Sequence, residues 1–71
     1  MTLGEKIRKL RKERKRSIAS CAEEIYVHTS TWCNWEKDKQ TPTVHFICDI
    51  ADVFSVKVDE LLKDEKGNWV I

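Results

Sequence analysis

The stretch IYVHTSTWCNWEKDK, residues 25 to 39, contains two tryptophans, one histidine and one cysteine but no glycine. Its flanks have the pattern of helices and its centre has the pattern of a turn. A tight turn between two helices usually needs a residue that tolerates positive φ, and glycine is the default choice. Tyr26 is the candidate at this bend, so we expect a helix–turn–helix whose turn forms at an energetic cost.

Two helices are predicted on the N-terminal side of this turn. The first should span about residues 3 to 15, and Thr2 with Glu5 fits a capping box in which each side chain takes a backbone amide. Ser17 is a good N-cap for a second, short helix that ends near Ile25. The apolar positions that define the inward faces of these helices are Leu3, Ile7 and Leu10, followed by Ile18, Cys21, Ala22 and Ile25.

Three helices are predicted after the turn, and no stretch inside the domain favours a strand. The third helix should span about residues 29 to 37, with both tryptophans facing inward. Pro42 biases the preceding residue, Thr41, away from helical geometry. Thr43 can then cap a fourth helix. A short fifth helix should follow near residue 58. The inward faces expected on the last two helices comprise Val44, Ile47, Cys48, Ile50, Ala51 and Phe54, then Val58, Leu61 and Leu62.

The length and composition restrict the possible functions. A chain of 71 residues makes one domain with a thin core. We expect no enzyme, no cofactor and no small-molecule substrate, because a substrate cleft with its supporting shell needs more residues. Three cysteines without a C-x-x-C pair, and no signal peptide, indicate a reducing cytoplasm. No apolar run approaches the ~18 residues of a membrane span.

Charge is distributed unevenly along the chain. Residues 1 to 16 contain eight basic and two acidic side chains, whereas the remainder contains five basic and ten acidic ones. Basic clusters attract phosphate backbones. A solvated helix face is the alternative interpretation of the same cluster.

Three motifs in a fixed order resemble one known family. They are GEKIRKLRKER near the N-terminus, V-x-x-S-T-x-x-x-WEKDKQTPT in the middle, and IADVFSVKVDELL near the C-terminus. Together they resemble the phage-repressor and Cro-like helix-turn-helix family, also called the xenobiotic-response-element type, over about residues 2 to 63. The resemblance implies an all-α, compact five-helix DNA-binding domain like that of lambda repressor, here residues 1–66. It also implies a bacterial or phage-encoded regulator, often from a prophage or mobile element.

The resemblance further implies a repressor that binds a near-palindromic operator on double-stranded DNA as a homodimer. Its third helix would enter the major groove. The base-reading positions carried over are Thr29, Ser30, Cys33 and Asn34, and Asn34 is the best reader because an amide can pair bidentately with adenine. The positions expected to contact phosphates are Ser17, His28, Lys37, Lys39 and Thr41. Arg11 and Glu36 match a pair that ties the first helix to the end of the third.

The chain departs from the family pattern at three kinds of position. Glutamine commonly follows the serine that caps the second helix, but here Ile18 stands there and we expect it to pack. His28 replaces a capping serine or threonine, and imidazole is a poor cap. The turn glycines are also missing, and the corresponding residues are Lys15, Tyr26, Asp38 and Ser55.

Several alternatives remain open at this point. The cysteines and histidines invite a zinc site, but no two pairs have finger spacing, so we expect no metal. Cys33 on the exposed side of the reading helix could act as a redox switch. The apolar tail, residues 67–71, either folds back over the domain or forms a strand that builds a dimer, and we favour the dimer. The alternative function is a protein-interaction module on the same fold with weakened DNA binding.

Overall fold

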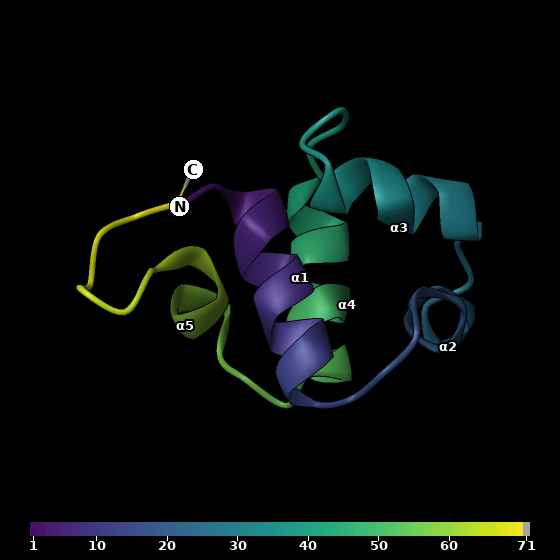
Figure 1. Ribbon diagram of the computed structural model, residues 1–71, viewed down its shortest axis with the longest axis horizontal. Helices are drawn as coiled ribbons and strands as arrows, with labels where there is room; N and C mark the ends of the chain where they lie inside the picture. The colour runs from purple at the N-terminus through teal and green to yellow at the C-terminus, as the bar shows by residue number, and fades with distance from the viewer. Residues whose placement is uncertain (71) are drawn as a thin grey trace.

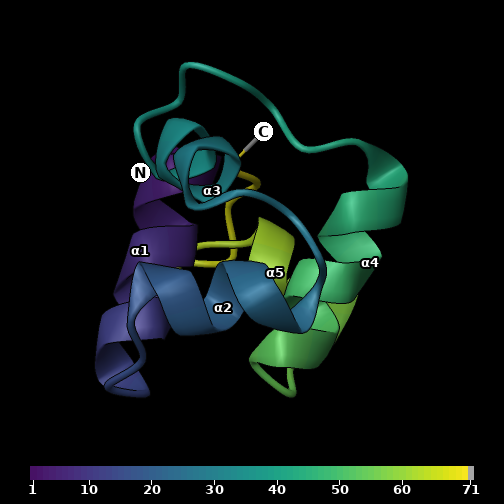
Figure 2. The same cartoon turned by 90° about the vertical axis from the view of Figure 1, so that its right-hand side faces the viewer.

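The computed structural model describes residues 1–70 and is all-α, as predicted. In Figure 1, α1 lies in front of α4 at the centre, with α3 and α2 on one flank and α5 on the other, and the turned view of Figure 2 shows α1 and α4 on opposite sides of the molecule. The final residue of the predicted tail, Ile71, lies outside the described residues. The helices are α1 (Leu3–Glu13), α2 (Ile18–Glu24), α3 (Thr29–Glu36), α4 (Val44–Val53) and α5 (Val58–Leu62).

Helix starts follow the capping residues that the sequence predicted. Thr2 accepts a hydrogen bond from the backbone N–H of Glu5, and the Glu5 carboxylate accepts one from the backbone N–H of Thr2, which is a complete capping box. Ser17 caps α2 and Thr43 caps α4, each by accepting a backbone N–H three residues on. The side chain of His28 makes no capping hydrogen bond to α3 within the described chain.

Aromatic side chains fill the centre of the core. Trp32 and Phe54 are fully buried, and their rings meet edge to face at 6.0 Å between centroids. Trp35 lies 5.6 Å from Trp32 and 5.3 Å from Phe46 on α4. Such aromatic contacts add to the free energy of area burial. Both tryptophans of the opening stretch are therefore structural, as expected.

The predicted inward faces of α4 and α5 were partly wrong. Cys48 is exposed, and Val44 is 78% exposed. The buried stripe of α4 is instead formed by Ile47, Ile50, Ala51, Val53 and Phe54. Cys48 follows Ile47 by one residue, so it projects about 100° away from it around the helix. Val58, at the start of α5, is also partly exposed at 38%.

The four expected glycine positions all adopt left-handed backbone geometry. Lys15, Tyr26, Asp38 and Ser55 have φ between 54° and 60°. In each case the next residue donates its N–H to a carbonyl five residues back, as Val27 does to Ala22 at 3.0 Å. This is the Schellman arrangement that ends a helix, with a residue other than glycine at its left-handed position. The prediction that these positions replace turn glycines is therefore confirmed.

The C-terminal tail folds back onto its own chain. Trp69 forms an antiparallel bridge with Lys63, and Val70 donates its N–H to the Leu62 carbonyl at 2.9 Å. Val70 is buried, whereas Trp69 remains 59% exposed with the Lys63 ammonium over its ring. Hydrogen bonds from the backbone N–H groups of Asn68 and Lys66 lower the pKa of Asp64 in the intervening turn. Of the two alternatives for the tail, the structure shows the fold-back over the domain, and the residue that packs on the core is Val70 and not Trp69.

Residues 1–70 contain neither a membrane-spanning helix nor a cluster of metal ligands. No helix in this range is long and apolar enough to cross a membrane. The same residues contain no group of three or more histidine, cysteine, aspartate or glutamate side chains arranged to hold a metal ion.

We expect Tyr26→Gly to stabilise the domain. The Tyr26 side chain is 95% exposed at φ 60°, so removing it relieves left-handed strain and loses little packing. The gain should be about 1 kcal/mol, which raises the melting temperature by roughly 4–8 °C in thermal unfolding of a domain of this size. The control Ala19→Gly, at an exposed helical position, should lower stability by about 0.5–1 kcal/mol. A lower melting temperature for Tyr26→Gly would show that the tyrosine contributes packing.

Candidate nucleic-acid interface

The helix pair α2 and α3 is joined by a turn of four residues, 25 to 28. Figure 2 shows α2 crossing the front of the molecule while α3 is seen almost end-on above it, so the two helices cross at a steep angle. Their packing is tightened by the inward residues Cys21 and Ala22 of α2, which are buried against the core. This arrangement leaves one long side of α3 at the surface of the molecule.

The two faces of α3 differ sharply in chemistry. Trp32 and Trp35 occupy the inner face, at 0% and 3% exposure. The opposite face carries the side chains that the sequence assigned to base reading. Of these, Thr29 and Ser30 are exposed and Cys33 and Asn34 are half-buried. All four lie on one side of one helix, as a groove-reading surface requires.

The predicted phosphate contacts surround the two ends of α3. Lys37, Lys39 and Thr41 are exposed in the loop that follows the helix, and His28 is exposed at its N-cap. Ser17 is exposed at the start of α2, and its hydroxyl already accepts the Ser20 N–H. The assignments to bases and phosphates are untested by the geometry and remain predictions.

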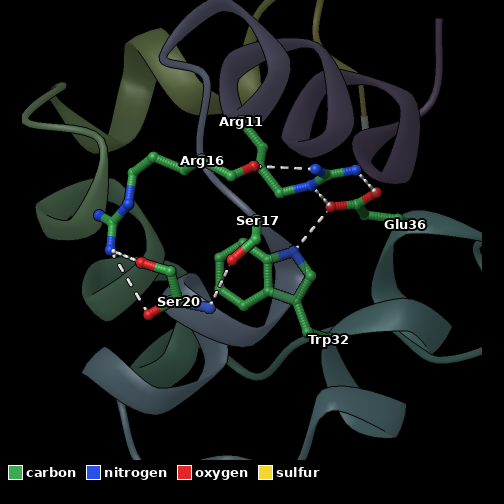
Figure 3. Close-up of polar contacts among 6 residues, drawn as sticks. All are labelled: Arg11, Arg16, Ser17, Ser20, Trp32 and Glu36. Carbon is green, nitrogen blue, oxygen red and sulfur yellow. Dashed lines mark hydrogen bonds and ion pairs between the residues drawn. The ribbon is translucent and has the colours of Figure 1, made fainter.

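The carboxylate of Glu36 joins α1 to α3. Arg11 donates to it from Nε at 2.6 Å and from Nη2 at 3.1 Å, and Trp32 donates from its indole Nε1 at 2.7 Å. The remaining terminal nitrogen of Arg11, Nη1, donates to the backbone carbonyl of Arg16 (Figure 3). The sequence suggested the ion pair through its family resemblance but gave no sign of the indole contact.

This cluster is well shielded from water. The side chains of Arg11 and Glu36 are only 13% and 6% exposed. The hydrogen bonds that Arg11 donates to the Glu36 carboxylate raise the pKa of Arg11 above its already high ordinary value, which burial alone would lower. The bidentate geometry fixes both the distance and the angle between the two helices. Glu36 is the last residue of α3, so its position also sets where Lys37 projects.

A second set of hydrogen bonds joins the loop after α3 to the start of α1. Asp38 accepts the Thr2 hydroxyl through one carboxylate oxygen and the Gly4 N–H, at 2.9 Å, through the other. Gly4 is required for this close approach, because a Cβ there would lie 2.4 Å from the Trp35 carbonyl oxygen and 2.6 Å from that of Glu36. Neither contact was predicted from the sequence, where the glycine inside a helical pattern was the one signal of a close approach.

The basic N-terminal segment is used differently from the expectation. Arg14 donates from Nε to the Phe54 carbonyl at 2.9 Å, and Arg16 donates to the Val53 carbonyl at 3.4 Å. These carbonyls lie at the end of α4, where a helix has unpaired acceptors and a negative dipole end. Arg16 also pairs with Glu24, and Lys9 pairs with Glu65. Much of the positive charge in this segment therefore holds the fold together, and Arg8, Lys12 and Lys15 are the exposed remainder.

Comparison with known proteins gives consistent results. A family model described as helix-turn-helix matches residues 7–61. Over 66 residues, 93% of this chain, the sequence is 33% identical to a protein named HTH-type transcriptional activator BcrR from Enterococcus faecalis. The match spans 32% of that relative, so the chain corresponds to about a third of its length.

A solved structure with the same fold is the crystal structure of the P22 c2 repressor protein in complex with synthetic operator 9T in the presence of Tl+. It matches with a TM-score of 0.82 and 25% sequence identity, over 96% of this chain and 98% of that chain. The predicted fold class, a compact five-helix domain of the lambda-repressor type, is therefore confirmed.

We expect Glu36→Gln to lower the free energy of unfolding by about 2–3 kcal/mol, because it leaves the shielded Arg11 guanidinium without its counter-charge. Thermal or urea unfolding followed by circular dichroism measures the change. Glu24→Gln is the matched control: its side chain is 47% exposed in its pair with Arg16, so its loss should cost less than about 1 kcal/mol. Equal effects of the two substitutions would contradict the bracing role of Glu36.

Proposed function

Because this chain belongs to the helix-turn-helix family, we propose that it is a sequence-specific DNA-binding transcriptional regulator. The observation that carries the proposal is the outer face of α3, where short polar side chains stand above two buried tryptophans. The exposed Lys37 and Lys39 follow the C-terminal end of that face and the exposed His28 stands at its N-terminal end, where a reading helix needs phosphate contacts. The double-stranded DNA partner is thus inferred from the chemistry of one surface.

In this proposal α3 lies in the major groove and each side chain has a distinct role. Asn34 pairs with the N6 and N7 edge of an adenine, and Thr29 and Ser30 contact bases near the start of the helix. Cys33 contributes a small apolar surface to the same face. The backbone is gripped by Lys37 and Lys39 together with Ser17, His28 and Thr41, which set the register of the protein without reading sequence.

We propose further that the protein acts as a repressor by covering a promoter. Occlusion needs only an occupied operator, so the interface described above is sufficient for it. One similar protein is named an activator and the other a repressor. A reporter gene placed behind the selected operator distinguishes the two, because repression lowers its expression and activation raises it.

We propose that the protein binds a near-palindromic operator as a homodimer. Two copies of α3 should then contact half-sites about one helical turn, ~34 Å, apart. The folded-back tail supports a dimer contact at its outer side. Trp69 is 59% exposed beside the bridge to Lys63, and an exposed aromatic on a strand-like edge favours association with a second copy.

The DNA-binding proposal is tested by titrating the protein with a pool of random duplexes at two salt concentrations. A DNA-binding regulator should enrich one sequence and should lose affinity steeply as salt rises. The alternative function, a protein-interaction module on this fold, predicts no enriched sequence and no salt-sensitive retention. The absence of the family's glutamine at Ile18 is the feature that favours this alternative.

We expect Asn34→Ala to relax specificity at one base pair of the operator. Loss of a bidentate contact should cost about 1–3 kcal/mol against the enriched sequence and much less against random DNA. Lys37→Ala is the control, because a phosphate contact should weaken all sequences alike and reduce the salt slope by about one. Competition binding with each variant measures both quantities. A uniform loss for Asn34→Ala would remove it from base reading.

We expect Trp69→Lys to shift the protein from dimer to monomer. The substitution places a charge at the proposed contact while Val70 keeps its buried position and its hydrogen bond to Leu62. Sedimentation equilibrium measures the association, and circular dichroism verifies the fold. Tyr26→Lys makes the same change at another exposed aromatic, far along the chain, and should leave the dimer intact. An unaltered dimer for Trp69→Lys would exclude the tail as the interface.

A further inference from the structure

We propose that a hollow between α1, α2 and α3 receives the 5-methyl group of a thymine in the operator, with Ile18 and Cys33 as its reading surface. The inference rests on the proposed DNA-binding function and makes it more specific. It gives Ile18 a role in recognition at the position where the family usually has an amide.

The hollow lies beside the reading face of α3. Its volume is about 200 Å3. Ile18 comes from the first turn of α2, Cys33 from the middle of α3 and Lys37 from the end of α3. The complete lining is Arg8, Arg11, Ile18, Cys33, Glu36 and Lys37.

The surface that the hollow presents to a ligand is apolar where α2 meets α3. Ile18 packs partly against the core and remains half-buried, so it was only partly correct to expect a purely packing role. Cys33 is also half-buried and has a free thiol, which behaves as a small apolar group. Neither side chain offers a strong donor or acceptor to a base edge.

The polar atoms of Arg11 and Glu36, which form the inner part of the lining, are already paired. Arg11 uses Nε and Nη2 on Glu36 and Nη1 on the Arg16 carbonyl, and Glu36 also accepts the Trp32 indole. No buried side-chain nitrogen or oxygen within the described chain lacks a partner. The inner surface of the hollow therefore offers no unsatisfied donor or acceptor to a base, and the free donors of the lining, Arg8 and Lys37, are exposed at its rim.

The rim of the hollow is cationic. Arg8 is exposed on α1 and Lys37 is exposed at the end of α3, whereas the charge of Arg11 is countered by Glu36. An apolar patch between two exposed cations matches an apolar group flanked by phosphates. In the major groove the one apolar group on a base edge is the thymine methyl, so the hollow selects thymine among the four bases.

The test uses the operator sequence obtained by selection. Each thymine is replaced in turn by deoxyuridine, which removes the methyl group and leaves every hydrogen-bonding atom in place. We expect one position per half-site at which the replacement weakens binding about fourfold, the effect of burying one methyl-sized group. In Ile18→Ala and in Ile18→Gln the thymine and deoxyuridine operators should bind equally at that position.

A matched control lies at the C-cap of the same helix. Ile25 is also a partly buried residue that packs against the core, but it does not line the hollow. Ile25→Ala should lower stability while leaving the ratio of thymine to deoxyuridine affinity unchanged. Because the ratio is measured within each variant, partial loss of folded protein cancels out, and circular dichroism verifies that each variant folds.

The possible outcomes separate the two levels of inference. Insensitivity at every thymine, or a fourfold preference that persists in Ile18→Ala, overturns the methyl site while DNA recognition stands. Failure to enrich any duplex overturns the proposed function and the methyl site with it. A preference lost in both Ile18 variants and kept in Ile25→Ala establishes the site.

Discussion

The Glu36 carboxylate is the group on which the placement of the reading helix depends. It accepts two hydrogen bonds from Arg11 on α1 and a third from the indole of Trp32 on its own helix. Through its indole N–H the buried Trp32 also supports the ion pair between Arg11 and Glu36. The burial of Trp32 and the angle between α1 and α3 are therefore coupled. Asp38 accepts hydrogen bonds from Gly4 and Thr2, so the start of the loop after α3 is held against α1 and its N-cap at two positions. The cations of that loop therefore project from a fixed base, which in the proposed complex limits the entropy lost when they meet a phosphate.

The positions of the arginines change the interpretation of the uneven charge along the chain. The strong positive surplus of the first sixteen residues suggested a basic arm for nucleic acid. In the fold, Arg14 and Arg16 reach the carbonyls at the end of α4, and Arg14 also lies 5.7 Å from the Phe54 ring centroid. Guanidinium groups satisfy acceptors that would otherwise stay unpaired at a helix terminus. In the proposed complex, the cations free to attract DNA are the exposed lysines after α3 together with Arg8, Lys12 and Lys15 of the N-terminal segment. With fewer free cations than the sequence suggested, the proposal places more of the recognition in direct contacts in the groove.

The sequence predicted what is local and missed what depends on distant parts of the chain. Capping residues such as Thr2, Ser17 and Thr43 act within one turn, so the helix starts were predictable. The left-handed positions were predictable because the family pattern marks where helices end. By contrast, Cys48 was assigned inward because it continues an apolar spacing, but the rotation of α4 is set by packing against other helices. The partners of Arg14, Arg16 and Asp38 are 34 to 40 residues away, and no spacing rule reveals them.

In the candidate site, too, the local features were predictable and those that depend on distant parts of the chain were not. The outer face of α3 follows from helical spacing alone, whereas the hollow beside Ile18 requires α1, α2 and α3 together.

Three of the left-handed positions hold lysine, tyrosine or serine, and each costs roughly 1 kcal/mol relative to glycine in that geometry. A non-glycine residue also restricts the unfolded chain, which returns part of that cost. The rest of this cost is offset by the stabilising free energy of the buried aromatic cluster and of the shielded Arg11–Glu36 pair. Each of these features holds more than one helix in place. Because α3 is supported in this way, its outer residues can vary without changing the position of the helix.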